Sequence, residues 1–565
     1  MLRIAFALAL DLVLLALLPL RLVRRWRAAP EGAWLEVKID GGLTEVARRV
    51  PFWQRRHQPV ALHSLRRVLA AVRADTRVTG VLFRIDALRV GSARATSLRD
   101  LLLALRAAGK KVAVYLPHGG GTLATYVASA ADQVLLGPET HLDLTGFAIE
   151  ATYLRGLLDR AGIEPEVFAK GRFKTAGEFL EKKSMSDAQR EQLGAVLDVA
   201  HQTLVDGLAS GRSVERAVAA SWVDQGPWSA RAALDAGLVD GVVYPDELAT
   251  CLEPARTAGA RVVPAAAYLR RRTLRFVPLR RPRHVAVVEV VGPIVSDAPL
   301  SLVPVAAEEP VCRTLRQARE DRRAAGAVLV VSSRGGSALA SDRMLRELTL
   351  LAKEKPVAVY MGDVAASGGY MIAVGAPTIV AQPTTVTGSI GVIAARMSAE
   401  SLLSRIGVAI EVVKRGARAD MMNPARPLSG DERSALERQL EEIYRAFLEV
   451  VARGRGRSVE QIEPLAGGRV WSGRDAHQHG LLDRLGGFDV ALADVVRRIG
   501  PSGDRLEPVV VGPEHFGPPG PLARLIRGGA EALRLDGVVA LAEIAASEPR
   551  AGAWLWSEVA AISEG

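Results

Sequence analysis

Cysteine, lysine and aromatic residues are scarce in this chain. Its 565 residues include two cysteines, Cys251 and Cys312, which exclude a disulfide framework and a cysteine-based metal site. Aromatic residues make up 5% of the chain and are not interleaved with a basic motif, so nucleic acid is not an expected partner despite a net charge of +11. That charge leaves an acidic lipid or an acidic protein open as a partner. The sequence holds no Walker A loop and no His/Asp/Glu cluster with metal-ligand spacing, so we expect neither metal nor cofactor.

Long apolar runs are also lacking, with one exception near the N-terminus. Ile4 to Leu20 is apolar except for Asp11, but a bilayer span needs about 20 residues and a central Asp costs roughly 2.5–3.5 kcal/mol. We predict that residues 1–30 form a membrane anchor, either a weak transmembrane helix or an uncleaved signal anchor. The alternatives are an amphipathic helix on the membrane surface and a hydrophobic helix docked on the protein. Arginines follow the run, and the positive-inside rule would leave the bulk of the chain in the cytoplasm.

The chain contains two copies of one sequence unit. Lys111–Leu116 resembles Pro356–Met361 at a shift of 245 residues, and Trp228–Asp240 resembles Trp471–Asp483 at a shift of 243. A near-constant offset over more than a hundred residues indicates an internal duplication. We predict a first repeat over 31–275, a second over 284–500 and a tail over 501–565.

Each repeat alternates apolar strand patterns with helical patterns. This order predicts an α/β fold with two tandem domains, each built on a parallel sheet with crossover helices. The predicted strands are Trp34–Ile39, Val81–Ile85, His284–Val290 and Ala327–Val331, and the predicted helices are Ser97–Ala107 and Ser341–Lys353. Pro254–Pro282 is expected to include the linker, and 523–546 is expected to form one or two amphipathic helices.

Gly362–Ala373 holds the candidate nucleophile, Ser367. The stretch follows an apolar strand pattern and opens into a helix-compatible, Ala-rich segment. A turn of small residues there would place Ser367 at the start of the helix, where unpaired N–H groups favour a negative charge. The alternative is a tight turn whose glycines serve packing alone. No Gly-x-Ser-x-Gly elbow surrounds this serine, and the histidines at 477 and 479 offer no better base.

The two repeats each lack a different residue of a candidate pair. At a shift of 245, Ser367 corresponds to Thr122 and Lys174 corresponds to Ala419, and both pairs are separated by 52 residues. A neutral lysine can take the proton of a serine hydroxyl, but its pKa must fall from about 10.4 to near 7.5. Burial beside Phe173 is one way to achieve this. The alternative is that Lys174 is an ordinary surface lysine.

These residues resemble the signal peptide peptidase A family, in its long two-domain form (protease IV). The resemblance covers roughly residues 34–490 and depends on four motifs together. They are Gly171–Lys174, Gly335–Ser337, Ala365–Tyr370 and Thr387–Val392. It implies two crotonase- or Clp-protease-like domains and a Ser/Lys dyad, with Ser367 as nucleophile and Lys174 as general base. Ser389 is similar to a family serine that positions the lysine, although a turn hydroxyl bonded to backbone is an equal alternative.

The glycines around the candidate nucleophile predict an oxyanion hole. Gly335-Gly336 follows a predicted strand and is expected to place a backbone N–H opposite Ser367, and the Gly368 N–H would be the second donor. The alternative is a flexible loop. The family has proline before the glycine pair, whereas this chain has Arg334.

Together these features predict a membrane-attached serine endopeptidase that cleaves hydrophobic peptides, such as cleaved signal peptides, without a cofactor. The alternatives are a crotonase-type acyl-CoA enzyme and a catalytically inactive membrane scaffold. The resemblance also implies a homo-oligomer, a tetramer in long forms. It places the catalytic domains on the periplasmic side of the inner membrane, against the arginine pattern, and we follow the resemblance.

Overall fold

A computed structural model of the chain divides into two compact units. One comprises residues 1–148 and 200–284, and the other comprises 149–199 and 285–562. The structure describes residues 2–48, 58–252, 261–273, 282–297, 304–501, 503, 506–512 and 554–556. The helices predicted within 523–546 lie outside these ranges. Residues 149–199 belong to the first sequence repeat but to the second compact unit, so the repeats and the units do not coincide.

The first unit is built on a six-stranded sheet in the order β11-β7-β5-β4-β1-β12, with every neighbouring pair parallel. Its strands are Gly241–Val242, Gln133–Leu136, Lys111–Leu116, Val78–Leu88, Ala33–Gly41 and Val262–Pro264, in the same order. Parallel neighbours require crossover connections, which the helices α3 (Leu62–Arg73), α4 (Ser92–Ala107) and α5 (Thr122–Ala128) supply. This arrangement confirms the α/β class. β12 and α12 (Ala265–Arg272) lie within the expected linker, which is therefore partly structured.

The N-terminal segment forms two consecutive helices. The helix α1 spans Leu2–Ala16 and α2 spans Leu18–Trp26, with a proline in the first turn of α2. Within the described ranges, the structure holds no helix whose length and apolar character would suffice to span a bilayer. The side chains of Leu12, Val13 and Trp26 are exposed, Trp26 by 72%.

The main sheet of the second unit runs β22-β20-β18-β16-β13-β24, with β19 (Ile379–Ala381) beside β18 and β23 (Arg484–Leu485) beside β19. The strands of the main path are Val470–Ser472, Val386–Gly388, Val357–Ala366, Ala324–Ser333, His284–Val291 and Glu507–Val510. Every residue of β18 is buried. The strand continues through Gly362–Ala366, which the sequence predicted as a turn, and all five of these residues are buried. The chain turns only at Ser367.

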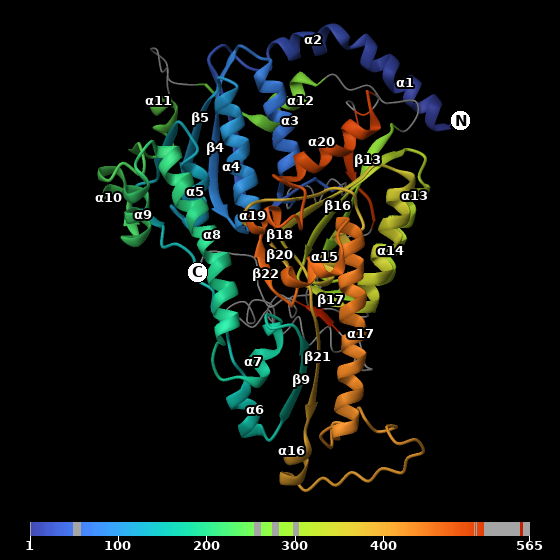
Figure 1. Cartoon of the computed structure of the whole chain (residues 1–565). Coiled ribbons are helices and arrows are strands. Elements are labelled where there is room, and N and C mark those ends of the chain that lie inside the picture. Colours follow the sequence, from blue (N-terminus) through green and yellow to red (C-terminus); the bar gives the residue numbers. More distant parts are fainter. Residues whose placement is uncertain are drawn as a thin grey trace. The chain divides into compact units, whose positions relative to one another are not determined.

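A second sheet of this unit runs β15-β14-β17-β25-β21-β9. Its strands are Ala306–Ala307, Ile294–Val295, Gly335–Ser337, Trp554–Trp556, Val392–Ser398 and Glu164–Lys170. The strand β9 comes from the first repeat, yet it pairs antiparallel with β21 along seven residues, from Glu164 opposite Ser398 to Lys170 opposite Val392 (Figure 1). This pairing brings the residues that follow β9 into the second unit.

Candidate active site

Ser367 lies between the end of β18 and the start of α15 (Gly368–Ala373). Its φ of 54° and ψ of −115° are unusual for a residue with a side chain, and such strain costs on the order of 1–3 kcal/mol. Two backbone bonds hold this conformation, because Ser367 N–H donates to Gly388 O at 2.8 Å and Ser367 O accepts from Met371 N–H at 2.8 Å. The residue is completely buried. The sequence prediction of a serine at the start of a helix is therefore confirmed.

Tyr370 anchors the helix that begins after Ser367. Its hydroxyl donates to Leu481 O at 2.7 Å, and burial raises its pKa well above the ordinary value. A neutral, buried phenol of this kind fixes the rotation of α15 about its axis. The first turn of α15, and the peptide N–H groups in it, are thereby held in place.

Lys174, from the first sequence repeat, reaches the same point. After β9, Gly171 adopts a φ of 107° and turns the chain, and Lys174 N–H closes the turn by donating to Gly171 O at 3.1 Å. The lysine side chain is only 4% exposed. It is therefore not the surface lysine of the alternative interpretation.

The side chains of Lys174, Ser367 and Ser389 meet in one cluster. Lys174 Nζ lies 2.8 Å from Ser367 Oγ, 3.1 Å from Ser389 Oγ and 3.1 Å from Ser389 O. Ser389 follows β20, has a φ of 52° and is buried, and its N–H donates to Arg469 O at 2.7 Å. Two serines with positive φ thus face one buried amine. The 2.8 Å between Lys174 Nζ and Ser367 Oγ is a distance at which a proton can pass from the hydroxyl to the amine.

Gln192 and a glycine pair support the lysine turn, and sequence reasoning missed them. Gln192, on α8 (Asp187–Arg212), donates to Phe173 O at 3.1 Å and to Thr175 Oγ1 at 2.7 Å, and its own oxygen accepts from Val470 N–H at 3.1 Å. A buried glutamine inside a helix has no local sequence signal. The pair Gly467-Gly468 is typical of a turn, but nothing in the sequence connects that turn with Lys174.

Gly468 packs directly against Lys174. A Cβ added to Gly468 would lie 2.5 Å from both Cα and Cβ of Lys174, so only glycine fits. The preceding Gly467 accepts a bond from Phe173 N–H at 2.9 Å, and a Cβ there would meet nothing closer than 3.9 Å. Gly468 is therefore required because Lys174 packs against it, whereas Gly467 has space for a side chain and contributes a hydrogen-bond acceptor.

The ring of Phe173, beside the buried Lys174, is in contact with two arginine side chains. The guanidinium of Arg172 lies 5.0 Å from its ring centre and that of Arg469 lies 4.6 Å from it. The ring is half-buried between these two cations. Both guanidinium groups are within the distance at which cation–π attraction acts.

The predicted oxyanion glycines lie close together, but their N–H groups differ. A Cβ at Gly368 would lie 3.3 Å from Gly335 Cα and 3.4 Å from Gly336 N, so the start of α15 lies against β17. The N–H of Gly335 donates to Ser333 Oγ at 3.1 Å, which makes Gly336 the better candidate donor beside Gly368. Gly336 has a φ of 152°, and a Cβ there would lie 2.0 Å from Ile294 O, so glycine is required.

The corresponding positions of the other repeat copy are differently built. Thr122 in the first unit is the first residue of α5, and its hydroxyl lies within 3.3 Å of Asp143 O and Gly146 O. Its Oγ1 also accepts from the N–H groups of Thr145 and Gly146 at 3.2 Å. Ala419 in the second unit is exposed and carries no titratable group. The second unit therefore brings together Lys174 from the first repeat and Ser367 from the second.

Comparison with known sequences shows the family of the chain. A family profile described as Peptidase family S49 matches residues 104–258 and again 349–498. Matches at corresponding places in both halves agree with a duplicated unit. The chain belongs to peptidase family S49, and its relatives support a serine peptidase.

Similar proteins come from a plant and from bacteria. The chain is 32% identical over 477 residues to "Serine protease SPPA, chloroplastic" of Arabidopsis thaliana, covering 83% of this chain and 69% of the relative. It is 32% identical over 457 residues to "Protease 4" of Salmonella typhi, covering 78% and 72%. It is 29% identical over 486 residues to "Protease 4" of Haemophilus influenzae, covering 82% and 78%.

Proposed function

We propose that this protein is a serine endopeptidase in which Ser367 is the nucleophile and Lys174 the general base. The observation that carries the proposal is the 2.8 Å contact between a buried amine and a buried, strained hydroxyl at the start of a helix. A serine hydroxyl is a weak nucleophile until a base takes its proton. Burial disfavours an ammonium ion, so the site suits a neutral lysine that accepts that proton.

The proposed reaction begins when Ser367 Oγ attacks the peptide carbonyl and its proton moves to Lys174 Nζ. The carbonyl oxygen becomes an oxyanion, and the N–H groups of Gly368 and Gly336 are the proposed donors to it. The intermediate then collapses, the C–N bond breaks, and Lys174 returns the proton to the leaving amine. Water, deprotonated by the same lysine, hydrolyses the acyl-enzyme and restores the serine.

Ser389 is proposed to position the base. Its hydroxyl and carbonyl oxygens both lie 3.1 Å from Lys174 Nζ, so they fix the direction in which the amine points. The strained φ of Ser389 supports such a role, because strain of this kind persists only where the surrounding structure enforces it.

The proposed substrate is an extended, hydrophobic peptide such as a cleaved signal peptide. The tail strand β25 lies antiparallel on β17, with Leu555 opposite Gly336 and Trp556 opposite Gly335. A peptide substrate can add to the edge of β17 in the same way, beside the proposed oxyanion donors. The tail strand is then a competitor for the substrate position.

Membrane association is proposed at the N-terminal helices. Exposed leucine, valine and tryptophan side chains on α1 and α2 occur together with Arg24 and Arg25 in the last turn of α2. Such a segment can bury its apolar side chains at a lipid surface while its arginines contact acidic headgroups. Location at the inner membrane of a bacterium, facing the periplasm, is proposed from the family resemblance.

The decisive experiment is reaction with a fluorophosphonate probe, which forms a covalent bond only with an activated serine. We expect the parent chain to be labelled, Ser367→Ala to be unlabelled, and Lys174→Ala to react at least a hundred-fold more slowly. A folded parent chain that resists the probe would refute the dyad and favour the inactive scaffold. Saturable binding of an acyl-CoA without labelling would favour the crotonase-type enzyme.

A further inference from the structure

Three neighbouring helices of the first unit are rich in arginine. The helix α12 contacts both α2 and α3, and all three belong to the first compact unit (Figure 1). Each helix carries three arginines, and none of the three contains an aspartate or a glutamate. A surface where cations cluster on helices that carry no carboxylate attracts an anionic partner.

A buried carboxylate ties these helices together. Asp75, just after α3, accepts a bond from the Tyr268 hydroxyl of α12 at 3.0 Å. It also forms ion pairs with Arg77 at 2.9 Å and with Arg272 of α12. Arg77 in turn donates to Trp26 O at the end of α2. The arrangement of the three helices is therefore fixed before a partner binds, which reduces the entropy lost on binding.

Four exposed arginines of α2 and α12 form no ion pair with any of the described residues. They are Arg24 and Arg25, in the last turn of α2, and Arg270 and Arg271, in the last turn of α12. The buried carboxylate of Asp75 does not compensate for them, because other groups already engage its oxygens. Their counter-charge comes from ions in solution or from a ligand.

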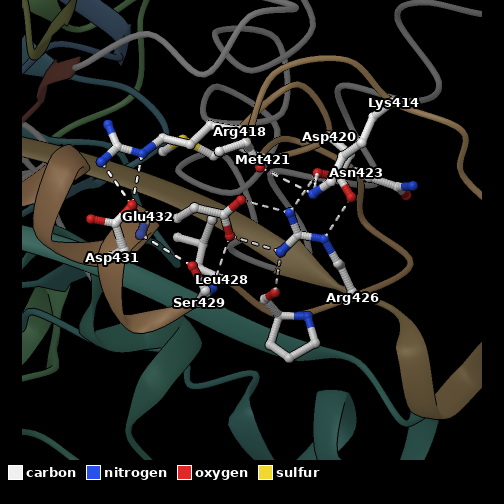
Figure 2. Close-up of polar contacts among 12 residues, drawn as sticks. Lys414, Arg418, Asp420, Met421, Asn423, Arg426, Leu428, Ser429, Asp431 and Glu432 are labelled. Carbon is white, nitrogen blue, oxygen red and sulfur yellow. Dashed lines mark hydrogen bonds and ion pairs between the residues drawn. The ribbon is translucent and has the colours of Figure 1, made fainter.

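In the second unit, by contrast, crowded cations are paired with carboxylates of the chain itself (Figure 2). Arg426 bridges Asp420 at 2.9 Å and Glu432 at 2.6 Å, and Lys414 contacts Asp420 at 2.7 Å. This ion cluster supplies its own counter-charges. The arginine-rich surface of α2 and α12 differs from it in exactly this respect, so it is the better place to look for an anionic ligand.

A cavity of about 460 Å³ is lined by residues of α3 and α12. Its lining combines two arginines and two hydroxyl groups with apolar side chains, namely Ser64, Arg67, Ala266, Leu269, Arg270 and Thr273. Side chains three or four residues apart share one face of a helix, so each helix presents one arginine together with smaller groups to the cavity. Cations beside apolar atoms suit an amphiphile with an anionic headgroup.

We propose that this cavity binds the phosphate headgroup of an anionic phospholipid. Arg67 and Arg270 are the phosphate ligands, because a guanidinium group donates two parallel hydrogen bonds to phosphate oxygens. The Ser64 hydroxyl supplies a further donor. Ala266 and Leu269 contact the glycerol and the first methylene groups of the acyl chains, whereas a free inorganic anion would leave these apolar side chains without a partner.

The site depends on the membrane association proposed for α1 and α2, and it adds lipid specificity to that association. The helix α2, which contacts α12, exposes Leu22, Val23 and Trp26. With these side chains at a lipid surface, the cavity beside α2 is within reach of the headgroups. The first unit then has a lipid contact that is separate from its N-terminal helices.

Vesicle flotation of the full chain tests the lipid class. Vesicles of phosphatidylcholine are compared with vesicles that also contain phosphatidylglycerol. We expect the parent chain to bind the anionic vesicles at least about ten-fold more tightly, and Arg67→Gln with Arg270→Gln to lose most of this preference. The matched control, Arg216→Gln with Arg231→Gln, removes the same charge from exposed positions of α9 (Arg216–Asp224) and α10 (Ala230–Asp235) and should keep the preference.

The outcomes of the flotation experiment separate the two proposals. Equal binding of the parent chain to both kinds of vesicle would overturn the headgroup site and leave membrane association through α1 and α2 standing. Binding to neither kind would overturn both. A preference that the control pair loses as fully as the cavity pair would also overturn the site, since it would come from net charge alone.

A cavity-filling variant separates a built site from diffuse surface charge. Ala266→Trp keeps the net charge and fills the cavity, and Ala70→Trp, at an exposed position of α3 outside the lining, is its matched control. Each full chain, in neutral detergent, is titrated with a soluble short-chain phosphatidylglycerol in a calorimeter. We expect saturable binding to the parent chain and to Ala70→Trp, and binding at least about ten-fold weaker to Ala266→Trp, with unchanged thermal midpoints.

Equal affinity of the two folded tryptophan variants would overturn the cavity as the binding site. The pair Arg67→Gln with Arg270→Gln is titrated as well, so the site is tested even if the larger side chain prevents folding. Inorganic phosphate is the competing ligand. If it displaces the lipid at equal concentration, the cavity is a site for a free anion and the assignment to a phospholipid is wrong.

Discussion

Replacing Gly468 by alanine should abolish most of the activity through a single added methyl group. Gly468 has a φ of 81°, and its new Cβ would lie 2.4 Å from Lys174 N and 2.5 Å from Lys174 Cβ. The new Cβ would contact the backbone and the Cβ of Lys174, and a change of side-chain rotamer cannot move these atoms away. The lysine must therefore move by about 1 Å. A displacement of that size at a reacting group costs roughly a hundred-fold in rate.

The neighbouring glycine provides the control. Gly467 also has a positive φ, 62°, so alanine at either position carries a similar backbone cost of roughly 1–2 kcal/mol. A Cβ at Gly467, however, meets nothing closer than 3.9 Å. We expect Gly467→Ala to keep kcat/KM for a fluorogenic hydrophobic peptide within about three-fold, and urea denaturation to confirm that both variants fold. Equal kcat/KM in the two folded variants would refute the placement of Lys174 at the reacting atoms.

Four further predictions follow from the site, the tail and the ion cluster. Ser389→Ala removes one of the oxygens beside the amine and should lower kcat about five- to ten-fold with little change in KM, as expected for a hydrogen bond of about 1 kcal/mol; a change confined to KM would contradict a positioning role. Gln192→Ala leaves a buried N–H and a carbonyl unpaired and should lower the free energy of unfolding in urea by about 1–3 kcal/mol, whereas an unchanged midpoint would show that the turn holds without it. Leu555→Pro should weaken the pairing of β25 with β17 and lower KM for peptide substrates; a raised KM would show that the tail strand assists binding. Hydrogen bonding to Arg426 lowers the pKa of Glu432 to about 2, so this carboxylate stabilises the fold above its unfolded-state pKa near 4 and loses that contribution as the pH falls towards 2. Stability measured from pH 5 to pH 2 should therefore fall more steeply in the parent chain than in Arg426→Gln, and parallel curves would contradict the pairing.

The candidate nucleophile and base could be predicted from sequence because each occurs in only one of the two repeats. Ser367 stands where the other copy has Thr122, and Lys174 stands where the other copy has Ala419. A shift read from strands and turns far from the site was enough to pair them. The structure then brings the two side chains into contact.

What the sequence could not predict are the contacts between segments distant along the chain. The pairing of β9 with β21 joins residues more than 200 positions apart, and local apolar patterns say nothing about such partners. The bond from the Gly335 N–H to Ser333 Oγ could not be predicted either, because it depends on the exact path of the loop. The contact of Arg469 with the Phe173 ring is likewise distant along the chain, and no local pattern indicates it.

The second compact unit contains residues 149–199 from the first repeat, so a cut between the two repeats divides this unit. A cut near residue 280 would yield one product that carries Lys174 without Ser367 and another that carries Ser367 without Lys174. The second product would also lack β9 from its second sheet, and β9 in the first product would lack its partner β21. The two parts of the second unit, 149–199 and 285–562, therefore have to stay on one chain, or reassociate, for Lys174 and Ser367 to meet.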